Sequence, residues 1–230
     1  MGGYMGKLLV VDLTSGELKD EPIDPTMAHD FVGGAGYAAR YLYNELGPDT
    51  DPLGPDNTLM FMTGPLVGTR APSCGRHAVC AISPQTGIWG QASAGGSLAA
   101  EMRKAGYDGI AISGASSKPV YLVIEDDKVD IKDAADLWGK DCYETTDILT
   151  ERHGAKADML EIGLAGENLV KFAGILNGKW GSVSRCGGGA VMGSKKLKAV
   201  VIRGTGKVCL LYTSPSPRDL RQDLVFRLLL

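Results

Sequence analysis

The stretch that decides the fold is Trp89-Gly90-Gln91-Ala92-Ser93-Ala94-Gly95-Gly96, because a closely similar stretch occurs again later in the chain, as Trp180-Gly181-Ser182-Val183-Ser184-Arg185-Cys186-Gly187. In each copy a Trp-Gly pair leads into a glycine cluster, and an apolar segment follows that ends at Gly114 or Gly204. Single glycines usually serve tight turns or close strand packing. A Trp-Gly pair before a glycine cluster in both halves indicates instead a duplicated unit.

The repeat extends upstream of these two stretches. Residues 59–64 with Gly68 resemble residues 159–163 with Gly166, and we align residues 78–82 with residues 169–173. Two copies of one unit normally pack about a pseudo-two-fold axis. Such packing would bring two glycine-rich turns of similar shape near one another, and it predicts a ligand that itself has two similar halves.

The local patterns predict an α+β fold. Apolar alternation around a Thr-Ser-Gly turn predicts a hairpin over residues 7–23, and a second hairpin is predicted over residues 120–131. Helical spacing of apolar residues predicts helices over residues 35–46 and 142–152. Hairpins are too frequent for a doubly wound parallel sheet. We therefore expect two related, mixed and largely antiparallel sheets about a pseudo-two-fold axis, flanked by short helices.

Composition excludes several classes of partner and site. The net charge is −3 with no long run of either sign, which argues against binding of nucleic acid or a membrane surface. No signal-peptide pattern follows Met1, so we expect a cytoplasmic protein. The five cysteines are scattered, which fits a reducing compartment and rules out a locally spaced zinc or iron-sulfur motif.

The character of the sequence changes after Lys207. The segment Tyr212-Thr213-Ser214-Pro215-Ser216-Pro217-Arg218-Asp219 resembles translated sequencing-adaptor text, and a leucine-rich end without a counterpart in the repeat follows it. We expect one domain over residues 1–207 and a non-native tail over residues 208–230 that does not pack into the core. A genuine short amphipathic tail is the alternative.

Two arginines are candidates for binding an anion. Arg76 follows a long Gly/Pro-punctuated loop, and Arg185 lies inside the second glycine turn. A guanidinium among small residues can hold a phosphate through two parallel hydrogen bonds, while nearby backbone N–H groups complete the site. The alternative is that each arginine pairs with a surface carboxylate.

Several motifs together resemble the N-terminal domain of tungsten-dependent aldehyde:ferredoxin oxidoreductases. They lie at residues 31–39, 51–57, 63–69 with 75–76, 163–171 and 189–199, in the order that the family has them. The resemblance implies a two-sheet base that carries a tungsten (or molybdenum) bis-pterin, whose two halves follow the symmetry of the domain. This cofactor would be the two-halved ligand that the repeat predicts.

The resemblance also implies site residues. Arg76 would contact a pterin phosphate, and two segments would line the two halves of the cofactor: Ser93, Ala94, Gly95 and Gly96 on one side, and Ser182, Val183, Ser184 and Arg185 on the other. A magnesium ion would be held between the phosphates by the backbone carbonyls of Ser93 and of Ser182 or Val183. Many members have Asn in place of Ser93 and a basic residue with two alanines in place of residues 181–183. The loss of that basic residue would weaken the phosphate grip or shift it to Arg185.

The chemistry of the family depends on later domains that are absent from this sequence, which hold a four-iron-four-sulfur cluster and the acid-base groups. We therefore expect this chain to supply no catalytic side chain. The full-length protein would oxidise aldehydes to carboxylic acids with ferredoxin or another electron-transfer subunit as acceptor, and it would be a homo-oligomer. The alternatives are the tungsten subunit of an aromatic acyl-CoA reductase and a stand-alone pterin-binding or delivery module.

Overall fold

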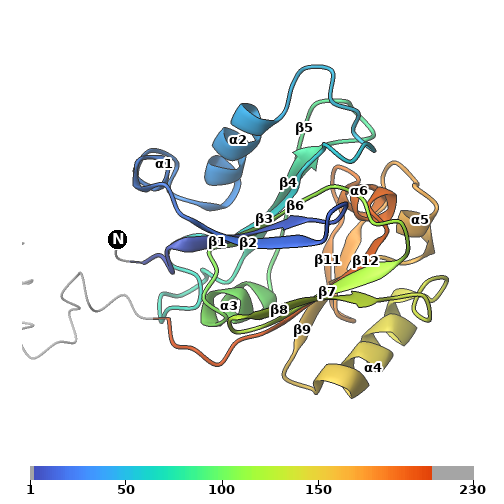
Figure 1. The fold of residues 1–230 in the computed structure, drawn as a ribbon. Helices are drawn as coiled ribbons and strands as arrows, with labels where there is room; N and C mark the ends of the chain where they lie inside the picture. The colour runs from blue at the N-terminus through green and yellow to red at the C-terminus, as the bar shows by residue number, and fades with distance from the viewer. Residues whose placement is uncertain (1–2, 209–230) are drawn as a thin grey trace, which may run out of the picture.

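The computed structural model describes residues 3–208 of the 230-residue chain. Its helices are interspersed among groups of consecutive strands along the chain (Figure 1). The strands are β1 (Lys7–Asp12), β2 (Glu17–Pro22), β3 (Leu59–Met62), β4 (His77–Ile82), β5 (Trp89–Ala94), β6 (Gly109–Ser113), β7 (Val120–Glu125), β8 (Lys128–Asp133), β9 (Asp158–Glu161), β10 (Ile175–Asn177), β11 (Gly181–Val183) and β12 (Leu197–Arg203). The helices are α1 (Pro25–Phe31), α2 (Gly34–Glu45), α3 (Leu98–Lys104), α4 (Cys142–His153), α5 (Leu164–Glu167) and α6 (Gly188–Ser194).

The strands form two six-stranded sheets with the same topology. The first has the order β2-β1-β6-β3-β4-β5, and the second, read from its other end, has the order β8-β7-β12-β9-β10-β11. Each strand of one sheet therefore has a counterpart in the other, and the counterparts follow the same order along the chain. In each sheet one pair is parallel, β1 with β6 and β7 with β12, and the other pairs are antiparallel. The predicted α+β fold with two related mixed sheets is confirmed.

The duplication is wider than the motifs indicated. The opening hairpin β1–β2 corresponds to the hairpin β7–β8, although the two share little sequence. A helix follows each hairpin, and the structure places α2 on the first sheet and α4 on the second. Strand pairing within a half-buried sheet requires only alternation of apolar residues, so the hairpins can diverge in sequence while their topology is preserved.

The two sheets face one another across the main core. Alternate residues of both sheets meet there with Leu98 and Met102 of α3 and Val191 and Met192 of α6. The opposite face of the first sheet is covered by α1 and α2, and that of the second by α4, as Figure 1 shows. Both faces of the central strands are consequently buried, which explains uninterrupted apolar runs such as residues 59–62.

Local capping explains where two of these helices begin. The Asp24 side chain accepts hydrogen bonds from the backbone N–H groups of Thr26 and Met27 before α1. Asp141 and Glu144 form a capping box at the start of α4. Caps of this kind typically contribute about 1 kcal/mol. Within residues 3–208, no helix has the length and apolarity needed to span a bilayer.

One predicted alignment is wrong. We matched residues 78–82 to residues 169–173, but the strand equivalent to β4 is β10, so residues 78–81 correspond to residues 174–177. Residues 169–173 instead belong to turns after α5, and Leu169 has a positive φ of 56°. An apolar run can line a turn that packs against a helix, and its composition alone does not distinguish this from a strand.

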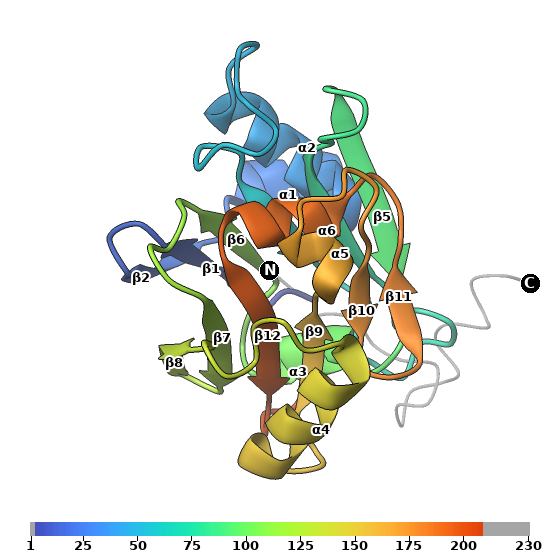
Figure 2. The same ribbon diagram turned by 90° about the vertical axis from the view of Figure 1, so that its right-hand side faces the viewer.

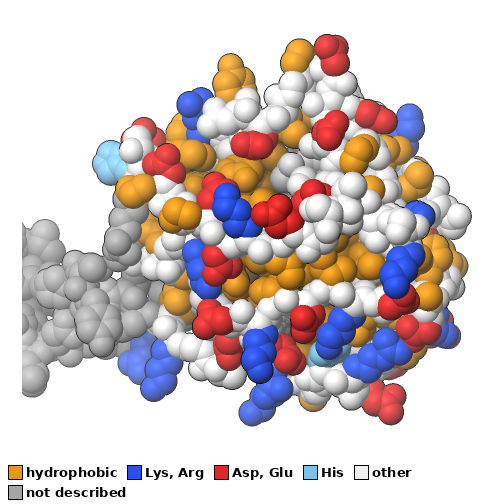
Figure 3. Space-filling view, viewed as in Figure 1, with side chains coloured by type: hydrophobic (Ala, Val, Ile, Leu, Met, Phe, Trp, Pro, Cys, Tyr) orange, Lys and Arg blue, Asp and Glu red, His pale blue; other side chains and the backbone are white. Residues whose placement is uncertain are grey.

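The last described residues run beside α3. The backbone N–H of Gly206 donates to the carbonyl of Lys104, and Val208 lies against Gly68 in the loop before β4. The expectation for the tail concerns mainly residues 209–230, which lie outside the described residues. On the face of the molecule seen in Figure 3, acidic and basic side chains are interspersed.

Candidate functional site

The edge strands β5 and β11 of the two sheets pack against each other (Figure 2). The Asn177 Nδ2 donates to the carbonyl of Gly95 at 3.1 Å, and the Cys186 thiol contacts the carbonyl of Gln91 at 3.4 Å. A Cβ on Gly90 would lie 2.9 Å from the Cβ of Cys186. The beginning of each strand therefore lies near the end of the other, so β5 and β11 run antiparallel at the junction of the two units.

A polar cavity of about 400 Å³ lies at this junction. Successive residues of β5 alternate between exposed and buried, and Gln91 and Ser93 lie on the exposed face. Ser182 and Ser184 are exposed in and after β11 in the same alternation. The residues that line the cavity are Arg76, Gln91, Ala92, Ser93, Ser182, Ser184 and Arg185. They include two guanidinium groups and no carboxylate, so the cavity is suited to an anion.

Arg76 is held against β5. Its Nη2 donates to the Ser93 carbonyl at 2.8 Å and to the Ser93 hydroxyl at 3.0 Å. Within residues 3–208, neither Arg76 nor Arg185 forms an ion pair with a carboxylate. The alternative of a surface ion pair is therefore not observed for either arginine, and both charges remain available to a ligand.

The two glycine turns beside the cavity require glycine. Gly96 has a φ of 114°, and a Cβ there would lie 3.0 Å from Asn177 Nδ2. Gly187, its counterpart in the repeat, has a φ of 71°, and a Cβ there would lie 2.0 Å from the carbonyl oxygen of Lys171. A side chain at either position would be strained by its backbone conformation, and at Gly187 it would also overlap the main chain.

The structure brings together most of the predicted site residues. Arg76, Ser93, Ser182, Ser184 and Arg185 all line the one cavity. Ala94 and Val183 are buried with their side chains in the core, so only their backbone could serve a ligand. Gly95 and Gly96 form the first turn beside the cavity without lining it.

Sequence reasoning missed Gln91 and Ala92 as cavity residues. Gln91 lies two positions before Ser93, and the strict alternation of a strand could have identified it as a neighbour on the same face. Ala92 contributes to the lining although its side chain belongs to the core.

The two arginines of the site occupy different positions in the two units. With β4 aligned to β10, the position equivalent to Arg76 is Phe172, which is 74% exposed. With β5 aligned to β11, the position equivalent to Arg185 is Ala94. The site is therefore pseudo-symmetric in its backbone, while its guanidinium groups come from non-equivalent positions.

His77, next to Arg76, does not belong to the cavity. It is buried, and neither ring nitrogen has a hydrogen-bond partner among the described residues. Burial, together with the nearby Arg76 charge, lowers its pKa to about 4, so the ring is neutral at physiological pH. Successive side chains of a strand alternate, so His77 lies on the face of β4 that Val79 shares, toward the core.

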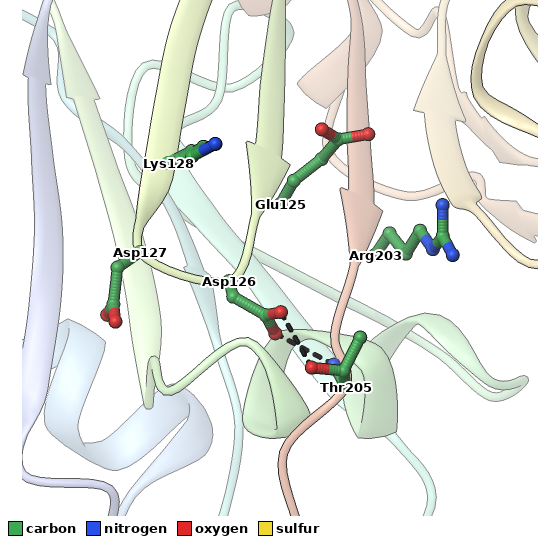
Figure 4. A pocket seen from close by; sticks show the side chains of 6 residues that line it. All are labelled: Glu125, Asp126, Asp127, Lys128, Arg203 and Thr205. Carbon is green, nitrogen blue, oxygen red and sulfur yellow. Dashed lines mark hydrogen bonds between the residues drawn. The ribbon is translucent and has the colours of Figure 1, made fainter.

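A second cavity, of about 410 Å³, lies at the turn between β7 and β8. Figure 4 shows the carboxylate of Asp126 directed toward Thr205. The Thr205 backbone N–H and hydroxyl each donate to this carboxylate at 2.7 Å. Asp126, which lines this cavity, thus has a structural role, because it holds the chain after β12 in place.

Comparison with known proteins shows that nearly all of the described residues are similar in sequence to one family. The sequence model described as "Aldehyde ferredoxin oxidoreductase, N-terminal domain" matches residues 8–204. A tungsten-containing aldehyde ferredoxin oxidoreductase of Thermococcus kodakarensis is 46% identical over 209 residues, which are 90% of this chain and 34% of that protein. The aliphatic sulfonate oxidoreductase WOR-like subunit of Pyrococcus furiosus is 38% identical over 97% of this chain and 38% of that protein.

A solved structure is similar as well. The active-site complex of benzoyl-coenzyme A reductase with 1,5-dienoyl-CoA contains a chain with a TM-score of 0.88 and 43% identity, over 90% of this chain and 32% of that one. This chain therefore spans about a third of the length of the relatives it matches.

Proposed function

Because the chain belongs to the aldehyde ferredoxin oxidoreductase family, whose N-terminal domain it matches over residues 8–204, we propose that it forms the cofactor-holding part of a tungsten bis-pterin oxidoreductase. The assembled enzyme would oxidise aldehydes to carboxylic acids and pass the electrons to ferredoxin or another electron-transfer subunit. Residues up to about 207 would form this domain, and an iron-sulfur cluster would lie in the part of the protein that follows.

The observation that carries this proposal is the cavity between β5 and β11. Two equivalent strands from two related units meet there, and two guanidinium groups that have no carboxylate partner within residues 3–208 line the same space. A ligand with two similar anionic halves fits a site with this backbone symmetry and charge. The tungsten named for the aldehyde-oxidising relatives is consistent with such a cofactor.

The residues of this chain would bind and orient the cofactor. Arg76 would hold one phosphate through its fork of N–H donors, and Arg185 would hold the other from the second glycine turn. The hydroxyls of Ser93, Ser182 and Ser184 would add hydrogen bonds, and the backbone of residues 94–96 and 183 would complete the cradle. The tungsten-pterin group would supply the two-electron chemistry, since the protein orients such cofactors and does not replace them.

A magnesium ion between the phosphates would be held by backbone carbonyls. Among the described residues, no group of three or more His, Cys, Asp or Glu side chains could hold a metal ion. The Ser93 carbonyl already accepts a hydrogen bond from Arg76, and a carbonyl oxygen has a second lone pair for a metal. The carbonyl of Ser182 or Val183 would provide the ligand from the second unit.

One observation favours a second candidate function. The chain is 43% identical to part of the benzoyl-coenzyme A reductase complex, about as similar as it is to the aldehyde-oxidising relatives. The cofactor-binding base would be the same for a tungsten-dependent reductase of aromatic acyl-CoA esters. Reduction of an aromatic acyl-CoA without aldehyde oxidation would favour this alternative.

The test uses the gene extended by the sequence that follows residue 204 in its source genome. We expect the product to contain tungsten or molybdenum and to reduce ferredoxin with an aldehyde as electron donor. Arg76→Lys should lower the metal content per protomer more than it lowers the melting temperature of the cofactor-free form, because lysine lacks the planar fork. Unchanged metal content with a destabilised cofactor-free protein would make Arg76 a structural residue and refute the site.

A further inference from the structure

Two tryptophans are exposed at equivalent places in the two units. Trp89 is the first residue of β5 and is 40% exposed, and Trp180 immediately precedes β11 and is 95% exposed. Tryptophan is among the residues that lose most by remaining in water, so exposure at two equivalent positions calls for a partner. Both lie next to the candidate site, and the proposed function gives neither a role.

Both indoles share a strand face with the cavity. In a strand every second side chain lies on the same side, so Trp89 shares its face with Gln91 and Ser93. By the same alternation Trp180 shares its face with Ser182 and Ser184. Two residues of strand span about 6.6 Å, and this is the backbone distance from each tryptophan to the nearest cavity residue on the same strand face.

We call the exposed faces of β5 and β11, together with the cavity between them, the platform. The antiparallel packing of β5 and β11 places the two indoles at opposite ends of this platform. Gly90, next to Trp89, lies against Cys186, and Gly96 lies against Asn177, which pairs with Gly181 next to Trp180. Gly95 lies six residues after Trp89, which in a strand is a distance on the order of 20 Å. Each end of the platform therefore holds one tryptophan.

Each tryptophan also lies toward the arginine at its own end. Cys186 lies against the residue after Trp89 and directly follows Arg185, so Trp89 and Arg185 share one end. Arg76 is bound to Ser93, near the turn that contacts Asn177, so Arg76 and Trp180 share the other end. Although the guanidinium groups come from non-equivalent positions, each end of the platform combines one cation and one indole.

We propose that Trp89 and Trp180 are stacking surfaces for the two planar heterocycles of one two-halved ligand, whose anionic groups are held between them by Arg185 and Arg76. The inference rests on the proposed function and extends it, because it assigns the recognition of the ring systems to this domain. A planar aromatic face stacks on a flat heterocycle, and an adjacent guanidinium neutralises the attached phosphate. The alternative is that the indoles contact a protein surface.

The test measures binding of neopterin monophosphate to the full 230-residue chain by calorimetry. The sequence contains three tryptophans, and a Trp138→Phe background makes the fluorescence report only on Trp89 and Trp180. We expect neopterin monophosphate to quench this fluorescence. Trp89→Leu and Trp180→Leu should each weaken binding about tenfold, in line with the contribution of an aromatic stacking pair. Trp89→Phe and Trp180→Phe should restore most of the affinity.

Two controls separate stacking from other effects. Tyr143 is an exposed aromatic residue on α4, outside β5, β11 and the residues that line the cavity, and Tyr143→Leu should leave the affinity for neopterin monophosphate unchanged. Inorganic phosphate should bind the Trp→Leu variants as it binds the wild type, because the arginines remain. If the Trp→Leu variants bind neopterin monophosphate with wild-type affinity, the stacking role is refuted while the proposed function stands. If the wild-type chain binds neither probe, both are refuted.

Discussion

Glu161 should make the stability of this domain decrease as the pH rises through neutrality. Its side chain is fully buried at the end of β9, where Oε1 accepts a hydrogen bond from the Thr146 hydroxyl at 2.7 Å. Oε2 has no partner among the described residues. The nearby Lys198 ammonium is bound by the Glu167 carboxylate and by the Lys140 carbonyl. Burial raises the pKa of Glu161 to about 8.

The size of the effect follows from the two pKa values. In the unfolded chain the carboxyl titrates near 4.5, so between about pH 4.5 and 8 the folded state retains a proton that the unfolded state has lost. The free energy of unfolding then decreases by about 1.4 kcal/mol per pH unit, or roughly 3 kcal/mol between pH 5.5 and 7.5. Above about pH 8 both states are ionised, and the decrease from this residue ends.

The assay is urea unfolding of the wild type and of Glu161→Gln at pH 5.5 and 7.5. Glutamine resembles the protonated acid at both pH values. The free energy of unfolding of Glu161→Gln, measured relative to that of the wild type, should therefore be higher at pH 7.5 than at pH 5.5, by up to about 3 kcal/mol. The matched control is Glu151→Gln, an exposed glutamate on α4, which should keep the wild-type pH dependence. Parallel pH profiles for Glu161→Gln and the wild type would show that Glu161 is already ionised in the folded protein.

Two further predictions concern stability. Gly187→Ala should destabilise the chain by more than about 2 kcal/mol in urea unfolding, because its Cβ would overlap the Lys171 carbonyl oxygen. Gly178→Ala, also at positive φ but with open space around its Cβ, is the control, and an equal loss in both would assign the effect to backbone conformation alone. Asp108→Ala should cost about 3–5 kcal/mol, because it leaves the buried Arg103 guanidinium without its carboxylate partner. A loss under 1 kcal/mol would mean that this ion pair is dispensable.

The repeat in the sequence was sufficient to predict the architecture. The matched Trp-Gly stretches correspond to β5 and β11, and the two related mixed sheets follow from the duplication. The helical spacing of apolar residues also predicted the helices α2 and α4. These features depend on neighbours close in the chain or on the repeat itself, which is why the sequence was informative about them.

The hairpin β7–β8 and the strand β10 show where the sequence was insufficient. The first was predicted as a hairpin but not as the counterpart of β1–β2, because its sequence has diverged while its pairing has not. Strand β10 was missed as the counterpart of β4 because residues 169–173 were aligned with β4 in its place. A short apolar run fits either a strand or a packed turn. Only hydrogen-bonded register distinguishes these possibilities.

The sequence by itself determined that this chain contains two copies of one unit, and it identified Arg76 and Arg185 as candidate anion-binding residues. The tertiary structure alone decided that β5 and β11 meet antiparallel, so that each unit contributes to both ends of the platform. It likewise decided that Gln91 lines the cavity and that His77 does not. The physical reason is that a repeat reports the shape of each unit, whereas the contact between units depends on how two buried sheet faces pack, and this depends on side chains distant in sequence.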